Sequence, residues 1–233
     1  MSYITLSNEI DSVYSKLLTE HKRSIAVVAT TAGEGVTSMV LALARRILLS
    51  GQSVLVVDFN SHNPFFSSSI CLPHFQQQDL PPRLLTDERH QLVMTGVQAP
   101  TSKSKLLHLR CPGKLEQQIS QWLTDFDFVV FDTTPFGQVN QHNIPAQRVA
   151  AAVDSCILMV LSGVTTDVMV QESVNKLNKV DASILGVVIN DKYSPTLQSE
   201  LIREVMRLPD FWGKLRATFV KVIRENKLLR MDV

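Results

Sequence analysis

Residues 30–38 read TTAGEGVTS, and the class of fold can be predicted from this segment and its two neighbours. It follows an apolar run at 25–29 and precedes a helix-like run at 39–48, which is the order of strand, glycine loop and helix that a phosphate-binding loop requires. Backbone N–H groups of such a loop and of the helix start hold phosphate without help from side chains. The candidate phosphate-binding residues are Gly33, Glu34, Gly35, Val36, Thr37 and Ser38.

One position of this loop departs from the expected pattern. Val36 stands where a loop of this kind carries a lysine, whose ammonium group would reach the outer phosphates. Thr37 comes next, and its hydroxyl is able to ligate Mg²⁺. Glu34 is expected to be exposed to solvent and to shape the loop, with no role as a base. The loop therefore predicts a nucleotide-binding fold that is poorly suited to nucleotide hydrolysis or phosphoryl transfer.

Composition sets limits on the class of protein. A chain of 233 residues, 45% hydrophobic and with a net charge of +1, is typical of one soluble α/β domain. These values exclude a disordered chain and a globally basic nucleic-acid binder, so no nucleic acid is expected as a partner. Three cysteines without paired spacing indicate reduced thiols in a cytoplasmic protein. We see no apolar signal core and no run long enough to span a membrane.

Apolar runs alternate with helical segments along most of the chain. Near-continuous apolar runs are typical of parallel strands that are covered on both faces. The sequence therefore predicts an α/β fold, a doubly wound and mostly parallel sheet flanked by helices, with ligands at the carboxyl ends of the strands. The expected strands are 25–29, 54–57, 106–109, 128–131, 156–161 and 184–189, and the expected helices are 8–20, 38–49, 114–123 and 166–179.

Two further regions complete the predicted organisation. Residues 61–104 are rich in proline and are expected to form loops and short helices. We expect a domain over 1–195 that includes the N-terminal helix, and an extension over 196–233 packed on that domain as helices 196–208 and 212–230. The basic faces of the last helix are interpreted as solvated; the alternative is a docking helix for an acidic partner or anionic lipid.

Polar residues follow three of the predicted strands. Asp58 and Asp132 end two strands, where a carboxylate beside a phosphate loop is able to hold Mg²⁺ or its waters. Thr37, Asp58 and Asp132 are thus the predicted metal residues, and Asp58 is also the candidate catalytic residue. Asn190 ends the last strand and is predicted to bind the adenine edge with its amide donor and acceptor. The alternative is that these side chains cap or close turns.

In this order the motifs resemble the cytoplasmic ATPase domain of bacterial tyrosine kinases (BY-kinases), which belong to the MinD/ParA-type deviant Walker P-loop ATPases. The resemblance covers roughly residues 9–192, with the loop at 32–38, a second motif at 54–64, a Walker B motif at 126–135 and a final strand at 184–190. It implies ATP or ADP with Mg²⁺ as cofactors. It also implies a membrane polysaccharide co-polymerase or another envelope-complex protein as partner, assembly into a homo-oligomer, and recruitment to the inner face of the cytoplasmic membrane.

The chain departs from that family at several points. Val36 replaces the loop lysine, and Asn60 replaces the second carboxylate that often follows Asp58. The tyrosine cluster near the C-terminus is missing, with only Tyr193 in that part of the chain. The family's Glu-x-x-Arg-x-x-Arg assembly motif is not matched after Glu9. These departures predict a weak or absent ATPase activity and no tyrosine kinase activity.

Three functions follow from this pattern. The favoured one is a catalytically impaired BY-kinase-like protein that regulates or scaffolds exopolysaccharide synthesis or export, as in biofilm or capsule formation. The second is an active ATPase or tyrosine autokinase that uses a substitute cation from Lys22, Arg23 or a partner. The third is a MinD/ParA-like positioning ATPase of an envelope machine such as cellulose synthase. Nucleotide binding with little turnover and a domain that binds no nucleotide both stay open.

Overall fold

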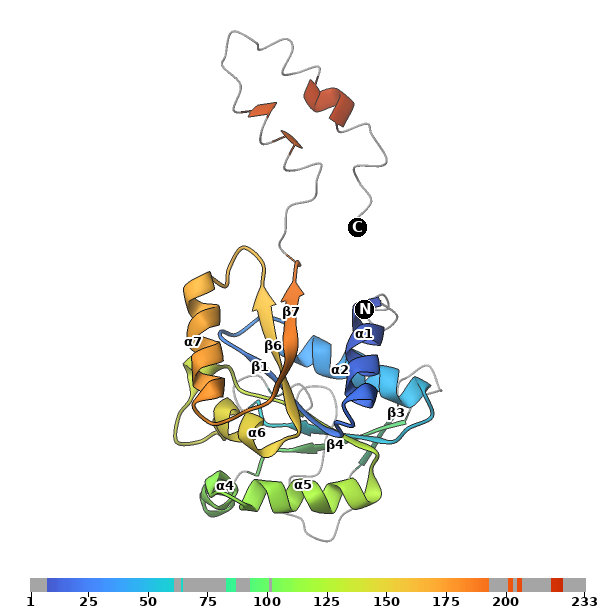
Figure 1. Cartoon of the computed structure of the whole chain (residues 1–233), viewed down its shortest axis with the longest axis vertical. Helices are drawn as coiled ribbons and strands as arrows, with labels where there is room; N and C mark the ends of the chain where they lie inside the picture. Colours follow the sequence, from blue (N-terminus) through green and yellow to red (C-terminus); the bar gives the residue numbers. More distant parts are fainter. Residues whose placement is uncertain are drawn as a thin grey trace. The chain divides into compact units, whose positions relative to one another are not determined.

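A seven-stranded sheet forms the centre of the fold, with the strand order β3-β4-β2-β5-β1-β6-β7 (Figure 1). All neighbouring pairs are parallel except β3 and β4, which are antiparallel. The doubly wound, mostly parallel sheet predicted from the sequence is therefore confirmed. The strands are β1 (Ser24–Ala29), β2 (Val54–Asp58), β3 (Arg83–Thr86), β4 (Val93–Gln98), β5 (Phe128–Asp132), β6 (Ser155–Leu161) and β7 (Ile184–Asn190).

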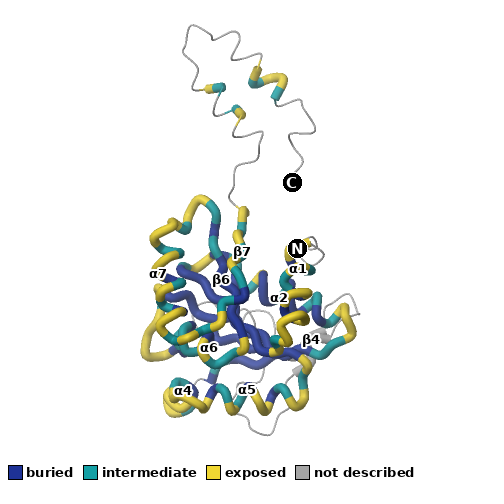
Figure 2. The backbone as a smooth tube through the Cα atoms, in the orientation of Figure 1, coloured by how far each residue is buried: buried dark blue, intermediate teal, exposed yellow. Residues whose placement is uncertain are grey.

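Helices cover both faces of this sheet, so the central strands β1, β2 and β5 are buried along their whole length. One apolar cluster joins α1 and α2 to one face, and a second cluster joins α4, α5, α6 and α7 to the other. Figure 2 shows the buried strands between helices whose outer sides are exposed. The helices are α1 (Asn8–Thr19), α2 (Val36–Leu49), α4 (Lys103–Arg110), α5 (Lys114–Asp125), α6 (Ala146–Ala152) and α7 (Asp167–Asn178).

The structure was computed as a model and describes residues 8–60, 64, 83–86, 93–100, 102–192, 201–202, 205–206 and 219–223. It divides into two compact units, Met1–Asn190 and Asp191–Val233, with the boundary at the end of β7. Most of the two predicted helices at 196–208 and 212–230 lies outside the described residues, so the packed C-terminal extension stays a prediction. Within the described ranges, no helix has the length and apolarity needed to cross a bilayer.

Four elements differ from the prediction. The expected strand at 106–109 is wrong, because these residues lie in α4, where Leu106 and Leu109 are buried and Leu107 is exposed. That spacing of three residues places the two buried leucines on one helix face. Residues 61–104 contain β3 and β4, where loops and short helices were expected, and β4 pairs with β2 at the edge of the parallel strands. Helix α6 was not predicted.

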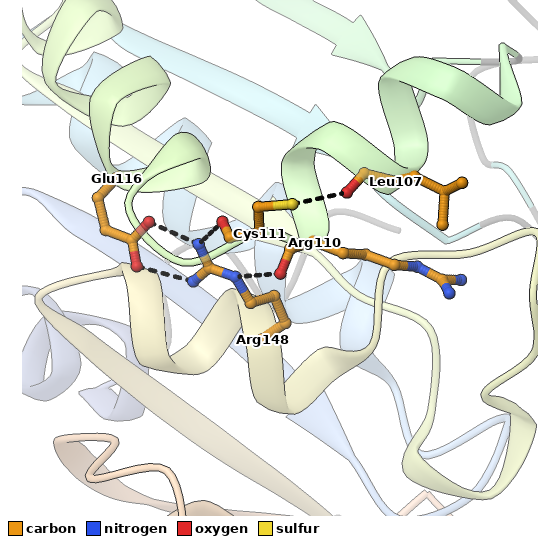
Figure 3. A network of polar contacts seen from close by, with 5 residues as sticks. All are labelled: Leu107, Arg110, Cys111, Glu116 and Arg148. Carbon is orange, nitrogen blue, oxygen red and sulfur yellow. Dashed lines mark hydrogen bonds and ion pairs between the residues drawn. The ribbon is translucent and has the colours of Figure 1, made fainter.

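An arginine joins the helices on the α5 face (Figure 3). Arg148 of α6 donates from its two terminal nitrogens to the Glu116 carboxylate of α5, at 2.7 and 2.5 Å. It also donates to the carbonyls of Arg110 and Cys111, at the end of α4. These bonds hold the pKa of Glu116 below its ordinary value, chiefly through the hydrogen bond from Arg148. One guanidinium thus fixes three helices against each other.

Candidate functional site

The predicted phosphate loop connects β1 to α2 and has the backbone shape that anion binding needs. Gly33 and Gly35 take positive φ angles of 88° and 99°, a region that favours glycine. A Cβ atom on Gly35 would lie 2.6 Å from Nδ2 of Asn190, so a larger residue there would have to displace the Asn190 side chain. Helix α2 begins at Val36 with Gly35 as its N-cap, which supplies no side-chain hydrogen bond. The first N–H groups of α2 are thus left to an anion or to solvent.

Glu34 corrects the sequence prediction, because its exposed fraction is 0% and not that of a solvent-facing loop residue. Its carboxylate accepts hydrogen bonds from the Thr30 backbone N–H at 2.8 Å, the Thr31 hydroxyl at 2.9 Å and the Thr165 hydroxyl at 2.6 Å. Such donors compensate for the burial of a charged group. The Glu34 side chain is therefore an internal brace of the loop, and its carboxylate is engaged by the protein itself.

Val36 lies in the apolar core and not at the surface of the loop. Its exposed fraction is 7%, and it belongs to the buried cluster that contains Ala29, Val40 and Met159. A valine has no group that could reach a phosphate oxygen. The position that carries the loop cation in the resembled family is therefore an apolar core position in this chain.

The three predicted metal residues meet at the carboxyl ends of β2 and β5. Asp58 and Asp132 are partners in the register of these strands, which places their side chains on the same face of the sheet, on strands about 4.8 Å apart. Both are buried, and the Thr37 hydroxyl donates to Oδ2 of Asp132 at 2.6 Å. The described residues contain no cluster of three or more His, Cys, Asp or Glu suited to a metal, so this set consists of one hydroxyl and two carboxylates.

Asp132 has an altered acidity. Burial raises the pKa of its carboxyl to about 7; the Thr37 hydrogen bond opposes this shift, while the charge of Asp58 adds to it. The Asn60 side chain also lies close enough to the carboxyl to lower the pKa, but the second oxygen, Oδ1, is buried and forms no hydrogen bond of good geometry with the described residues. Buried polar atoms are rarely left in this state, so the oxygen fits a ligand such as a cation or a water molecule. The residues of this edge therefore fit Mg²⁺, whereas the loop lacks the cation that would serve the outer phosphates.

Asn190 and Ser38 take up the two remaining predicted positions. The Asn190 side-chain amide donates to the backbone carbonyl of Glu34 at 3.0 Å, and the Asn190 backbone carbonyl accepts from the Ser162 N–H at 2.9 Å. Asn190 thus fixes the loop from the end of β7, and the adenine contact stays a prediction. Ser38 lies exposed in the first turn of α2.

The two proposed substitute cations lie at the wrong end of β1. Lys22 and Arg23 precede this strand, whereas the loop follows it, and six strand residues span about 20 Å. The Arg23 guanidinium donates to the backbone carbonyls of Leu123, Phe126 and Asp127. Neither residue therefore lies beside the phosphate loop. Lys22 and Arg23 thus do not support the hypothesis of an active enzyme that uses a substitute cation.

Three residues of the site were not found from the sequence. Thr165 and Ser173 contact the loop from the region after β6, with the Ser173 and Thr30 hydroxyls 2.7 Å apart. Gln98 ends β4 directly beside Asp58. A polar residue after an apolar strand would have been the signal for Gln98, had residues 93–98 been identified as a strand. Thr165 and Ser173 had no such signal, because their contacts cross more than 130 residues of sequence.

Comparison with known proteins supports the fold. No known family profile matches the chain, and no curated relative matches it either. Among solved structures, the kinase domain of Escherichia coli tyrosine kinase ETK is 23% identical, with 80% of this chain and 78% of that chain covered and a TM-score of 0.59. The VpsO kinase domain is 20% identical, with 81% and 98% covered and a TM-score of 0.57.

A second group of similar structures comprises ATP-binding enzymes outside the kinases. Cobyrinic acid a,c-diamide synthase from Mycobacterium smegmatis, with bound ATP analog and magnesium, is 18% identical; 72% of each chain is covered, with a TM-score of 0.54. At these identities the likeness concerns the fold. The chain therefore has the P-loop α/β fold that bacterial tyrosine kinase domains share with related ATPases, as the sequence resemblance predicted.

Proposed function

We propose that this chain is a catalytically impaired BY-kinase-like protein that regulates or scaffolds a bacterial exopolysaccharide synthesis or export complex. The observation that carries the proposal is the burial of Val36 in the apolar core at the first position of α2. Removal of a group that stabilises developing charge commonly slows a reaction by several kcal/mol of activation free energy, about a hundredfold to a thousandfold or more. A loop without its cation is therefore suited to binding more than to phosphoryl transfer.

The preserved parts of the site support nucleotide and Mg²⁺ binding within this proposal. Gly33 and Gly35 keep the loop backbone open to phosphate, and Thr37, Asp58 and Asp132 offer oxygen ligands. The similar cobyrinic acid a,c-diamide synthase was solved with an ATP analog and magnesium, which favours the same ligand class for this fold. The pKa of Asp132, raised to about 7, weakens Mg²⁺ binding at neutral pH, because the metal must displace a proton.

The proposed partner is a membrane polysaccharide co-polymerase or another envelope protein, which would recruit the chain to the inner face of the cytoplasmic membrane. Support for this part is the motif order that resembles BY-kinases, together with a fold like that of the ETK and VpsO kinase domains. Assembly with further copies of the chain belongs to the same proposal. A scaffolding role requires the surface of the folded domain and no turnover.

Calorimetric titration with Mg²⁺-ATP and Mg²⁺-ADP tests the nucleotide part. We expect binding in the micromolar range, about −8 kcal/mol, without measurable hydrolysis or autophosphorylation. Val36→Lys is the matched variant that restores the cation, and we expect it to tighten Mg²⁺-ATP more than Mg²⁺-ADP. Robust turnover by the unaltered protein would contradict the impairment, and a lack of binding at millimolar nucleotide would show that the loop is purely structural.

Complementation tests the scaffolding part. In cells that lack this protein, exopolysaccharide yield is expected to fall, and a folded Asp58→Ala variant is expected to restore it. Asp58 is the candidate catalytic residue, so a role that depends on turnover would not survive this change. Failure of the variant to complement, at an unchanged protein level, would contradict a role as scaffold alone.

A further inference from the structure

Gln98 extends the polar row at the carboxyl edge of the sheet by one strand. It ends β4, its exposed fraction is 7%, and it is the register partner of Asp58, which is in turn the partner of Asp132. Register partners on parallel strands point to the same face of the sheet. Val56 and Val130 precede the two aspartates by two residues and belong to the α2-side cluster, so the row lies on the face that carries α2.

Among the buried polar atoms of this row, a donor and an acceptor on different strands have no hydrogen-bond partner among the described residues. They are Nε2 of Gln98, which is a donor, and Oδ1 of Asp132, which is an acceptor. The two residues flank Asp58, on strands about 9.6 Å apart at two strand spacings. A buried donor and a buried acceptor are both satisfied by water, which offers two protons and two lone pairs.

The strand order indicates whether such a water would belong to a bound metal ion or be held by the protein itself. Along the edge the order is β1 with the phosphate loop, then β5 with Asp132, β2 with Asp58 and β4 with Gln98. Gln98 therefore lies on the far side of the acidic pair from the phosphate loop. A water in the shell of a metal ion presents its protons outward, so the N–H donor of Gln98 does not suit it. The donor suits a water that the protein itself holds.

We propose that Gln98 is a positioning residue that holds a buried water molecule beside Asp58, at the outer end of the polar row. The inference rests on the proposed function only in taking this edge of the sheet as the binding site. Gln98 belongs neither to the phosphate loop nor to the predicted metal residues Thr37, Asp58 and Asp132. A nucleotide bound at the loop would extend its phosphates along this edge of the sheet, and the proposal places the water beyond the outermost one.

A high-resolution crystal structure of the full chain is the direct test. We expect an ordered water within hydrogen-bond distance of Gln98 Nε2 and linked, directly or through a second water, to Asp132 Oδ1. We expect Gln98→Met, which keeps the side-chain length and removes the donor, to lose this water while the two aspartates stay in place. A dry site, or a protein acceptor bonded to Gln98 Nε2, would overturn the proposal.

Calorimetry provides a second and independent readout. ADP with aluminium fluoride and Mg²⁺ mimics a phosphoryl group with a water on its axis, whereas ADP alone lacks that water. We expect Gln98→Met to weaken the aluminium fluoride complex by about fivefold to tenfold, the range of one hydrogen bond, and to leave ADP binding unchanged. The exposed Gln117→Met on α5 is the control and should change neither affinity.

The two tests separate this proposal from the proposed function. If no variant binds ADP, nucleotide binding is wrong, and the crystal structure alone decides whether Gln98 holds a water. If Gln98→Met weakens both complexes equally, or neither, Gln98 is not a positioning residue for water even where ADP binds well.

Discussion

Glu34 is the residue on which the shape of the phosphate loop depends most. Its buried carboxylate accepts three hydrogen bonds, from Thr30, Thr31 and Thr165. We expect Glu34→Ala to lower the free energy of unfolding by about 2–4 kcal/mol, since it leaves buried donors without partners. Urea unfolding measures this change. Glu172→Ala on the exposed side of α7 is the control, and an equal, small effect of both variants would contradict the role of Glu34 as a brace.

Asp132 should make the stability of the protein depend on pH. Its pKa rises from an ordinary 3.8 to about 7 because the carboxyl is buried and lies beside Asp58. Between these values the folded protein binds a proton that the unfolded chain has released, so this stabilisation is lost as pH rises from about 4 to about 7. Asp132→Asn stays neutral at every pH and should remove that slope.

Urea unfolding at pH 5, 6, 7 and 8 (chosen within and just above that window) checks this prediction. Relative to the Asn variant, the unaltered protein should lose stability with each step up to about pH 7 and then level off. A constant difference between the two proteins across this range would show that the folded carboxyl keeps an ordinary pKa.

The residues of the site were predictable to different degrees. Thr37, Asp58 and Asp132 could be grouped from sequence, because the carboxyl ends of parallel strands meet at one edge of a sheet. The burial of Glu34 could not, because a charged residue in a glycine loop is normally exposed, and Thr165, one of the groups that compensates its charge, lies 131 residues away. The absence of the loop lysine was visible, but the inclusion of Val36 in the core was not.

At the scale of helices, Arg148 is the joint between α4, α5 and α6 (Figure 3). We expect Arg148→Ala to lower the free energy of unfolding by about 1–3 kcal/mol, since charge-assisted bonds to Glu116 and to two carbonyls are lost. Arg148→Lys should recover little, because an ammonium group cannot form the paired contact with a carboxylate. Thermal and urea unfolding at neutral pH measure both variants.

The Arg148–Glu116 pair also predicts how the free energy of unfolding changes at low pH. Arg148 holds the pKa of Glu116 below its ordinary value of 4.5, so the stabilisation is present above that value and is lost as pH falls through the lowered pKa. The difference between the unaltered protein and Arg148→Ala should therefore shrink in acid. Lys179→Ala, on an exposed residue after α7, is the control, and a gap that stays constant down to low pH would contradict the assignment.

The elements themselves were predicted where their pattern was unambiguous. The apolar runs of β1, β5 and β6, rich in β-branched or aromatic residues, were predicted correctly as buried strands, and α1, α2, α5 and α7 show helical spacing. The run at 106–109 is four residues long, and an apolar run of that length fits a strand or a buried helix turn equally. Strand β4 was missed because Thr95 and Gly96 interrupt its apolar pattern, and pairing with β2 stabilises it instead.

At the scale of the whole molecule, the first unit contains the entire sheet and both apolar clusters. We therefore expect residues 1–192 to fold cooperatively without the remainder of the chain, with one unfolding transition by circular dichroism and by tryptophan fluorescence. If 196–233 packs on this domain, as the sequence predicts, the shortened chain should instead be less stable than the full chain. A shortened chain that is insoluble or loses several kcal/mol of stability would favour the packed extension.

The burial of Val36 also has a consequence for how this protein can change over generations. A lysine introduced there would place an ammonium group beside apolar neighbours, so we expect Val36→Lys to be less stable than the unaltered protein even where it binds nucleotide more tightly. A stable chain with a cation at this position would thus need compensating replacements in the surrounding core.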